Sequence, residues 1–308
     1  MSMLLSLLKR LITSLRCLPP QGCWRFGRWA GACFACLPGR DQRRAREHLR
    51  QAYPAASPAW IEATAQRAFA HAGGMALWML WSLGQDPQRL KRSLLVEGRD
   101  HLAEFMRASR SGSGTVVFTA HFGNWELLGR LVGALVPVSV VGRRLRSPLA
   151  DALVKWMRTG TGCRQIDQQE GLRPVLRDLR DGRSIGCLAD QDVPALSGVF
   201  VPWFGQAAYT PIGPAQLALM VPNTALQVLV CYRRGRRWCL HAGPRWQPPP
   251  GDRAAAAQAL TQRATAYIEG LVRRHPSQWV WWHRRWRTRP EQRPRAPVLS
   301  AFPPQELP

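Results

Sequence analysis

Short apolar runs alternate with amphipathic stretches through the middle and later parts of the chain. The apolar runs are rich in β-branched residues and lie at 115–119, 137–141, 184–189 and 226–232. The amphipathic, helix-like stretches begin near Asn124 and after Pro214, and cover 148–157 and 171–179. Strands and helices that alternate at this spacing predict an α/β fold, with a largely parallel central sheet flanked by helices.

The two ends of this α/β region differ from its middle. Residues 24–83 are rich in alanine and aromatic side chains and predict helices only, with a stop at Pro54 and a new N-cap at Ser57. Residues 226–241 predict a hairpin that turns at 234–236, and 254–274 predict a long helix. The chain after Arg287 is rich in proline and arginine, so we expect disorder there.

The first residues predict a helix that lies in a membrane interface. On a helical projection one arc is apolar and the other carries Lys9, Arg10 and Arg16. The apolar arc consists of Leu4, Leu5, Leu7, Leu8, Leu11, Ile12 and Leu15. Pro19 ends the segment before the roughly 20 apolar residues that a bilayer span needs. The alternative is an ordinary amphipathic helix of the core.

These patterns suggest three regions. We expect residues 1–37 to form interfacial, membrane-anchoring helices, 38–289 to form one enzyme-sized domain, and 290–308 to form a disordered tail.

The charge of the chain calls for an anionic partner. The formal net charge is +24, and nearly all of the positive charge is arginine, which also reflects compositional bias. The arginines are spread along the chain, and neither a finger spacing nor a basic zipper is present, which argues against a dedicated nucleic-acid binder. An anionic lipid membrane suits this charge. The eight cysteines have no metal-site spacing and predict reduced thiols in a cytosolic compartment.

The strongest chemical candidate follows the apolar run 115–119. His121 comes directly after this run, and Gly123 and Asn124 open the next helix, so the imidazole should project from the carboxyl edge of the sheet. Glu126 lies five residues on, where we expect its carboxylate to reach back to one imidazole nitrogen. Such a pair suits the deprotonation of an alcohol. The alternative is a buried histidine beside a helix-capping glutamate, and the strand-to-helix setting favours catalysis.

Gly123 and Asn124 are candidate binding residues because of their position. They stand at the start of the predicted helix, where backbone N–H groups can stabilise an oxyanion or a phosphate. No covalent intermediate, metal or cofactor is needed for the expected chemistry.

Four segments together resemble one known family. They are 121–129 (HFGNWELLG), 190–192 (DQD), 198–205 (GVFVPWFG) and 276–286 (PSQWVWWHRRW). In order and spacing they resemble the bacterial lipid A late acyltransferase family, over about residues 43–289. The resemblance implies transfer of an acyl chain from acyl carrier protein, an acidic partner, to a hydroxyl of a lipid A precursor. It also implies the cytoplasmic face of the inner membrane, with peripheral or monotopic attachment.

The resemblance also implies roles for single residues. His121 would be the general base and Glu126 its partner, and Arg158, Asp190 and Gln191 would contribute to substrate binding. Arg143 belongs to an arginine-rich variant of a family segment beside the expected headgroup site. His48 and Trp203 depart from the family pattern without touching the catalytic pair.

Two other functions stay open on the sequence. One is acyl transfer to another glycolipid, an ornithine lipid or a polyene headgroup. The other is a non-catalytic protein that binds membrane or nucleic acid through its arginine-rich face. The tryptophans of 276–286 could form an interfacial belt or pack in the core. Acyl chain length, and a carrier-protein as against a coenzyme A donor, are not determined by the sequence.

Overall fold

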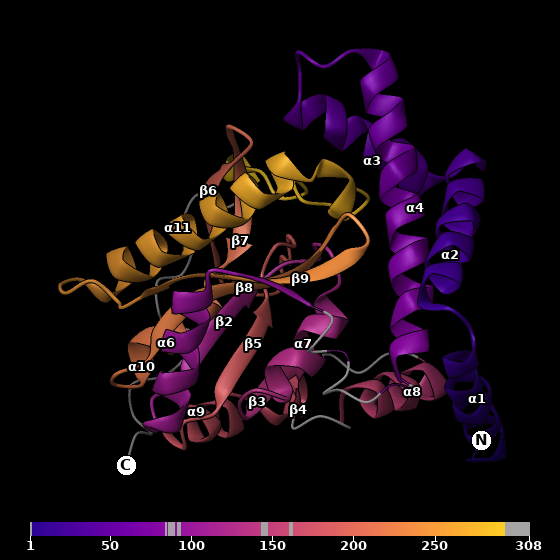
Figure 1. The fold of residues 1–308 in the computed structure, drawn as a ribbon. Helices are drawn as coiled ribbons and strands as arrows, with labels where there is room; N and C mark the ends of the chain where they lie inside the picture. The colour runs from indigo at the N-terminus through magenta and orange to yellow at the C-terminus, as the bar shows by residue number, and fades with distance from the viewer. Residues whose placement is uncertain are drawn as a thin grey trace.

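A seven-stranded, mostly parallel sheet forms the centre of the protein, as a computed structural model shows (Figure 1). The structure describes residues 2–83, 85, 90, 94–142, 147–159 and 163–292. The strand order is β1-β9-β8-β2-β5-β3-β4. The strands are β1 (Leu95–Glu97), β2 (Thr115–Thr119), β3 (Val138–Gly142), β4 (Cys163–Asp167), β5 (Ser184–Leu188), β8 (Ala225–Arg234) and β9 (Arg237–Trp246). Only the β8–β9 contact is antiparallel. The predicted α/β class is therefore confirmed.

Helices cover both faces of this sheet. The helices between and after the strands are α6 (Arg99–Arg110), α7 (Trp125–Gly133), α8 (Pro148–Thr159), α9 (Arg173–Arg180), α10 (Gly213–Met220) and α11 (Arg253–Arg274). Side chains alternate along β2: Val116 and Phe118 pack with α9, α10 and α11, and Val117 packs with α6 and α7. Burial on both faces explains why β2 is a continuous apolar run.

The N-terminal helices form a separate layer beside the sheet. They are α1 (Ser2–Ser14), α2 (Pro20–Cys36), α3 (Arg40–Ala52) and α4 (Pro58–Leu83). Helix α2 runs along α4 at one side of the molecule, and α1 lies near the end of α4 that is next to α8 (Figure 1). At Gly31 a Cβ atom would lie 2.2 Å from the carbonyl oxygen of Phe69, so only glycine permits this close helix contact. None of the helices in the described ranges combines the length and apolarity that a bilayer span needs.

Most predicted elements are present, and several short ones were not predicted. The helices in 24–83 are confirmed, as are the strands β2, β3, β5 and β8 and the hairpin, whose turn is Gly235-Arg236. The unpredicted elements are β1, β4, α6 and a small antiparallel hairpin of β6 (Gly198–Trp203) and β7 (Gln206–Pro211). Residues 293–308 of the predicted tail lie outside the described residues.

Candidate active site

His121 lies just beyond the carboxyl end of β2, in the middle of the sheet. Strand β2 is paired in parallel with β5, and the register sets Thr119 opposite Leu188. Two residues past each of these stand His121 and Asp190. The sheet therefore brings an imidazole and a carboxylate together at its carboxyl edge, where open α/β sheets place their functional groups.

Asp190 holds His121 through two hydrogen bonds. The Nδ1 atom of His121 lies 2.8 Å from Oδ1 of Asp190, and the backbone N–H of His121 donates to Oδ2 at 2.9 Å. The indole N–H of Trp279 donates to the same Oδ2 at 2.8 Å. Burial by itself would raise the pKa of the Asp190 carboxyl, but the His121 imidazole and these hydrogen bonds hold this pKa well below its usual range. The carboxylate is therefore ionised and its direction is fixed.

Glu126 has a different partner from the expected one. It lies in the first turn of α7, and its two carboxylate oxygens accept hydrogen bonds from Nε and Nη2 of Arg158, at 3.0 and 2.6 Å. Burial lowers the pKa of Arg158, but the hydrogen bonds and charge of Glu126 outweigh burial and raise this pKa. The expected contact between Glu126 and the imidazole is replaced by the contact with Asp190. Arg158, predicted to bind an anionic substrate group, is occupied by a side-chain carboxylate.

Gly123 and Asn124 shape the turn that carries His121. The N–H of Gly123 donates to the carbonyl of Gln278 at 2.9 Å, and the N–H of Asn124 donates to the carbonyl of Cys231 at 2.6 Å. Both N–H groups therefore already donate to backbone carbonyls, and the binding role expected of Gly123 and Asn124 stays a prediction. Gly123 has φ +64°, and a Cβ there would lie 2.1 Å from the carbonyl oxygen of Cys231. The side chain of Asn124 caps α7 by accepting from the N–H of Leu127.

A second histidine lies beside His121. The rings of His121 and His283 are 4.7 Å apart at their centres and nearly perpendicular. The side-chain nitrogen of Gln191 lies 2.8 Å from Nδ1 of His283 and 3.4 Å from Nε2 of His121. Burial, followed by the nearby His121, lowers the pKa of His283 to about 4, so this ring is neutral near pH 7.

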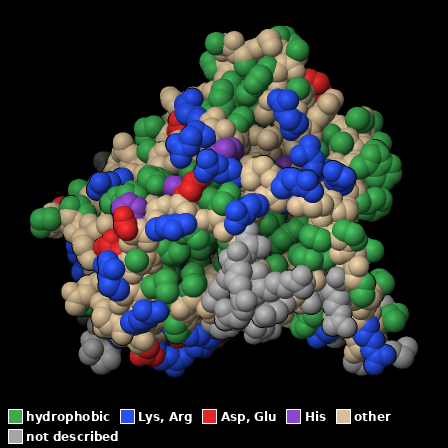
Figure 2. Space-filling view, viewed as in Figure 1, with side chains coloured by type: hydrophobic (Ala, Val, Ile, Leu, Met, Phe, Trp, Pro, Cys, Tyr) green, Lys and Arg blue, Asp and Glu red, His purple; other side chains and the backbone are tan. Residues whose placement is uncertain are grey.

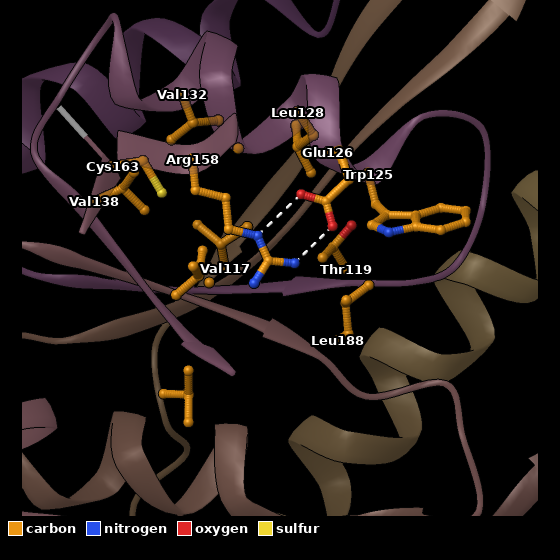
Figure 3. Close-up of a pocket in the computed structure, with 14 residues that line it drawn as sticks. Val117, Thr119, Trp125, Glu126, Leu128, Val132, Val138, Arg158, Cys163 and Leu188 are labelled. Atoms are coloured by element: carbon orange, nitrogen blue, oxygen red, sulfur yellow. Dashed lines mark hydrogen bonds and ion pairs between the residues drawn. The ribbon is translucent and has the colours of Figure 1, made fainter. Parts of the chain in front are cut away.

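An apolar pocket opens next to His121. Trp125 lines it, and the rings of Trp125 and His121 are 5.0 Å apart at their centres. The pocket lies between α7 and the sheet and encloses about 620 Å³, open solvent at its mouth included. Figure 3 shows the Glu126–Arg158 ion pair inside it among aliphatic side chains. Val132, Val138 and Cys163 also line the pocket.

The sequence did not identify every residue of this site. Asp190 was expected to bind substrate, and its contact with His121 became visible only with the strand order. Trp279 and Trp281 are buried in the core, so core packing describes these two better than an interfacial belt. Arg143 lies outside the described residues. In the described part of the chain, no group of three His, Cys, Asp or Glu side chains could hold a metal ion.

The known proteins that this chain resembles in sequence include acyltransferases. The chain is 33% identical over 199 residues to a phosphatidylinositol mannoside acyltransferase of Mycolicibacterium smegmatis. This aligned stretch covers 63% of this chain and 62% of the relative. It is 30% identical over 207 residues to the lipid A biosynthesis lauroyltransferase of Escherichia coli K12, which covers 66% of this chain and 65% of the relative. The match thus spans somewhat less than two thirds of each relative's length.

A family model agrees with these relatives over a longer stretch. The model, described as bacterial lipid A biosynthesis acyltransferase, matches residues 2–288. This range contains the pair of His121 and Asp190, the apolar pocket and the N-terminal helices. Because the match takes in nearly the whole chain, the protein belongs to the bacterial lipid A biosynthesis acyltransferase family.

Proposed function

We propose that the protein transfers a fatty acyl chain from an acyl thioester to a hydroxyl group of a membrane glycolipid. The observation that carries this proposal is the contact of His121 with the buried Asp190, directly beside an apolar pocket. The pair supplies a general base for a hydroxyl, and the mostly aliphatic lining of the pocket suits a hydrocarbon chain. The family membership supports the same reaction class.

His121 would take the proton of the acceptor hydroxyl. With Nδ1–H donating to Asp190, Nε2 is left with a lone pair that can accept this proton. Asp190 keeps the ring in this tautomer and stabilises the imidazolium that forms. The hydroxyl oxygen then bonds to the thioester carbonyl carbon, the tetrahedral oxyanion collapses, and the carbon–sulfur bond breaks. The thiolate that leaves takes the proton from His121.

The start of α7 would stabilise the oxyanion. A helix leaves its first N–H groups without partners inside the helix, and its N-terminus carries a partial positive charge. In α7 the third of these groups, from Leu127, is capped by Asn124. We therefore place the oxyanion at the preceding two groups, the N–H of Trp125 and of Glu126. This position replaces the one predicted at Gly123 and Asn124.

The apolar pocket would hold the acyl chain. Its lining is aliphatic from Val117 and Leu128 to Val138, and burial of a methylene group contributes about 0.8 kcal/mol. The Glu126–Arg158 ion pair is then a polar element within the acyl site. We expect it to shape the pocket and contact the thioester end of the donor.

The proposed acceptor is a lipid A precursor and the proposed donor is acyl carrier protein. The relatives named as lipid A biosynthesis enzymes support this acceptor, and the acidic character of carrier proteins complements the net charge of +24. The relative named as a phosphatidylinositol mannoside acyltransferase supports another glycolipid as the second candidate. The thioester is a co-substrate in these steps, which require no further cofactor.

We further propose that the outer face of α1 and α2 lies in a membrane, at the cytoplasmic face of the inner membrane. Exposed large apolar side chains of the described chain gather there: Leu7, Leu11, Leu18, Phe26, Trp29, Phe34 and Leu37. Hydrophobic side chains are visible along this edge in Figure 2. A gathering of large exposed apolar side chains is typical of an interaction site. Arg25 and Arg28 flank Phe26 and suit anionic headgroups.

The reaction can be tested with defined substrates and with cellular lipids. Purified protein receives acyl carrier protein or coenzyme A thioesters together with a lipid A precursor or a mannosylated phospholipid. We expect mass spectrometry to find one added acyl group on one of these lipids, and to find the same group missing from lipids of a strain that lacks the chain. Failure to acylate any glycolipid, with salt-sensitive binding of duplex DNA, would favour the non-catalytic alternative.

A further inference from the structure

The segment from Trp279 to Thr288 contacts each residue of the Asp190-Gln191-Asp192 triplet. The indole N–H of Trp279 donates to Asp190, and the side-chain nitrogen of Gln191 lies 2.8 Å from Nδ1 of His283. The hydroxyl of Thr288 donates to Oδ1 of Asp192 at 2.8 Å. One stretch of chain close to the C-terminus therefore determines how the triplet is oriented.

Within this stretch, Trp279 donates a side-chain hydrogen bond directly to Asp190 of the proposed catalytic pair. The side chain is 1% exposed and packs against Trp203 and Trp281, so the indole is held firmly. Its backbone forms an antiparallel bridge with Phe122, next to His121. The N–H of Val280 donates to the carbonyl of His121 at 3.2 Å. Trp279 thus sits on the same short bridge that fixes the backbone of the histidine.

The indole N–H has a specific effect on the Asp190 carboxylate. Oδ2 accepts from Trp279 and from the backbone of His121, and this leaves Oδ1 to face Nδ1 of the imidazole. Asp190 is 4% exposed, so water cannot replace a missing donor at low cost. Without the indole N–H, the Asp190 carboxylate is freer to rotate. Its Oδ2 atom also has one hydrogen bond fewer to offset the negative charge that faces His121.

We propose that Trp279 is a positioning residue of the acyl transfer reaction: its indole N–H fixes the Asp190 carboxylate, which in turn orients His121. The inference rests on the proposed function, because it takes His121 as the base. Other charged or titratable groups face Asp190 as well. They are His283, 4.7 Å from His121 between ring centres, and the buried Arg285. Both of these side chains are unaltered in variants that change residue 279 alone.

The chain contains a matched control two residues away. Trp281 is also fully buried and packs edge-on in the same aromatic cluster, with its ring centre 4.8 Å from that of Trp279. Its indole N–H donates to the backbone carbonyl of Pro276, at 2.6 Å. Replacement of Trp281 therefore removes an indole and a hydrogen bond from the same cluster without changing a contact of Asp190.

The test compares Trp279→Phe with Trp281→Phe in the full-length protein. The readouts are kcat, KM for the acyl thioester and the pH profile of kcat/KM, together with circular dichroism. In a second pair of variants, a benzothiophene analogue of tryptophan, with sulfur in place of N–H, is incorporated at 279 or 281. This analogue keeps the ring shape, so it gives an answer even where phenylalanine disturbs folding.

We expect kcat to fall about tenfold or more for the two changes at 279, with KM nearly unchanged. The acid limb of the pH profile should move up by about 0.5–1 pH unit, because a more negative Asp190 retains the imidazolium to higher pH. The changes at 281 should leave this limb in place. Equal kcat and equal pH profiles for the 279 and 281 analogues would overturn the inference. Full activity in His121→Ala would instead overturn the proposed function.

Discussion

Two carboxylates lie near His121, and their partners give them different tasks. Asp190 is buried and contacts the imidazole directly, whereas Glu126 is bound to Arg158 inside the apolar pocket. A carboxylate that orients the proposed base would act on the chemical step, and an ion pair in the proposed acyl pocket would act on the binding of substrate. The structure thus separates two carboxylates that both stand close to the proposed chemistry.

We expect Glu126→Gln to raise KM for the acyl thioester several-fold, with a smaller change of kcat and an unchanged pH profile. The reason is that this variant breaks the ion pair with Arg158 and leaves the contact of His121 with Asp190 intact. Steady-state kinetics with varied thioester concentration measure the effect. The double variant with Arg158→Gln is the control and should recover part of any lost thermal stability. A collapse of kcat with a shifted acid limb would show that Glu126 acts on His121.

At the scale of elements, the order of the strands decides the site. The pattern of apolar runs predicts β2, β3 and β5 and also places His121 at a carboxyl edge. It does not predict that β5 pairs with β2, because strand order follows from packing of the helices over the sheet. Glu126 is five residues from His121 in sequence, but α7 directs its carboxylate toward Arg158. Asp190 is sixty-nine residues away and is brought into contact by one parallel pairing.

His71 connects the helical layer to the turn that carries His121. It lies on α4, packs edge-on against Trp24 of α2, and its Nε2 lies 3.4 Å from the carbonyl oxygen of Gly123. Burial lowers the pKa of His71 to about 3, so the folded protein keeps this ring neutral where an unfolded chain would protonate it. Stability therefore falls as the pH drops below about 6.5, the usual pKa of histidine.

We expect His71→Leu to make the free energy of unfolding less dependent on pH. Between pH 7 and 4.5 the wild type should lose about 2–3 kcal/mol more than the variant, since each pH unit below 6.5 corresponds to about 1.36 kcal/mol. Urea unfolding at both pH values measures this difference. His101→Leu on α6 serves as the control for loss of a histidine elsewhere. Equal pH dependence of His71→Leu and wild type would contradict the burial of a neutral His71.

At the scale of the whole molecule, exposed large apolar side chains are unevenly distributed. The sequence predicts an amphipathic first helix, and the structure adds α2, whose outer face exposes Phe26, Trp29 and Phe34. The pattern of α2 alone did not show which face would be covered, because the cover is α4, held at close range through Gly31. The exposed face therefore becomes visible only when the helices are packed.

We expect the wild type to bind vesicles of phosphatidylglycerol and phosphatidylcholine, and to bind more weakly at high salt. The triple change of Phe26, Trp29 and Phe34 to Ser should weaken binding at least tenfold, since each side chain loses apolar burial. Co-sedimentation with vesicles measures this. Val141→Ser, also an exposed apolar position, is the control and should bind like wild type. Undiminished binding of the triple variant would place the membrane contact elsewhere.

The pair of His121 and Asp190 carries the proposed reaction, and its direct test is the rate of acyl transfer in variants of each residue. The rate of thiol release from an acyl thioester is measured in the presence of the glycolipid acceptor. We expect His121→Ala to lower this rate by about 10²- to 10⁴-fold, and Asp190→Asn to lower it strongly as well, with both proteins folded. A rate close to that of wild type in His121→Ala would contradict the proposed chemistry.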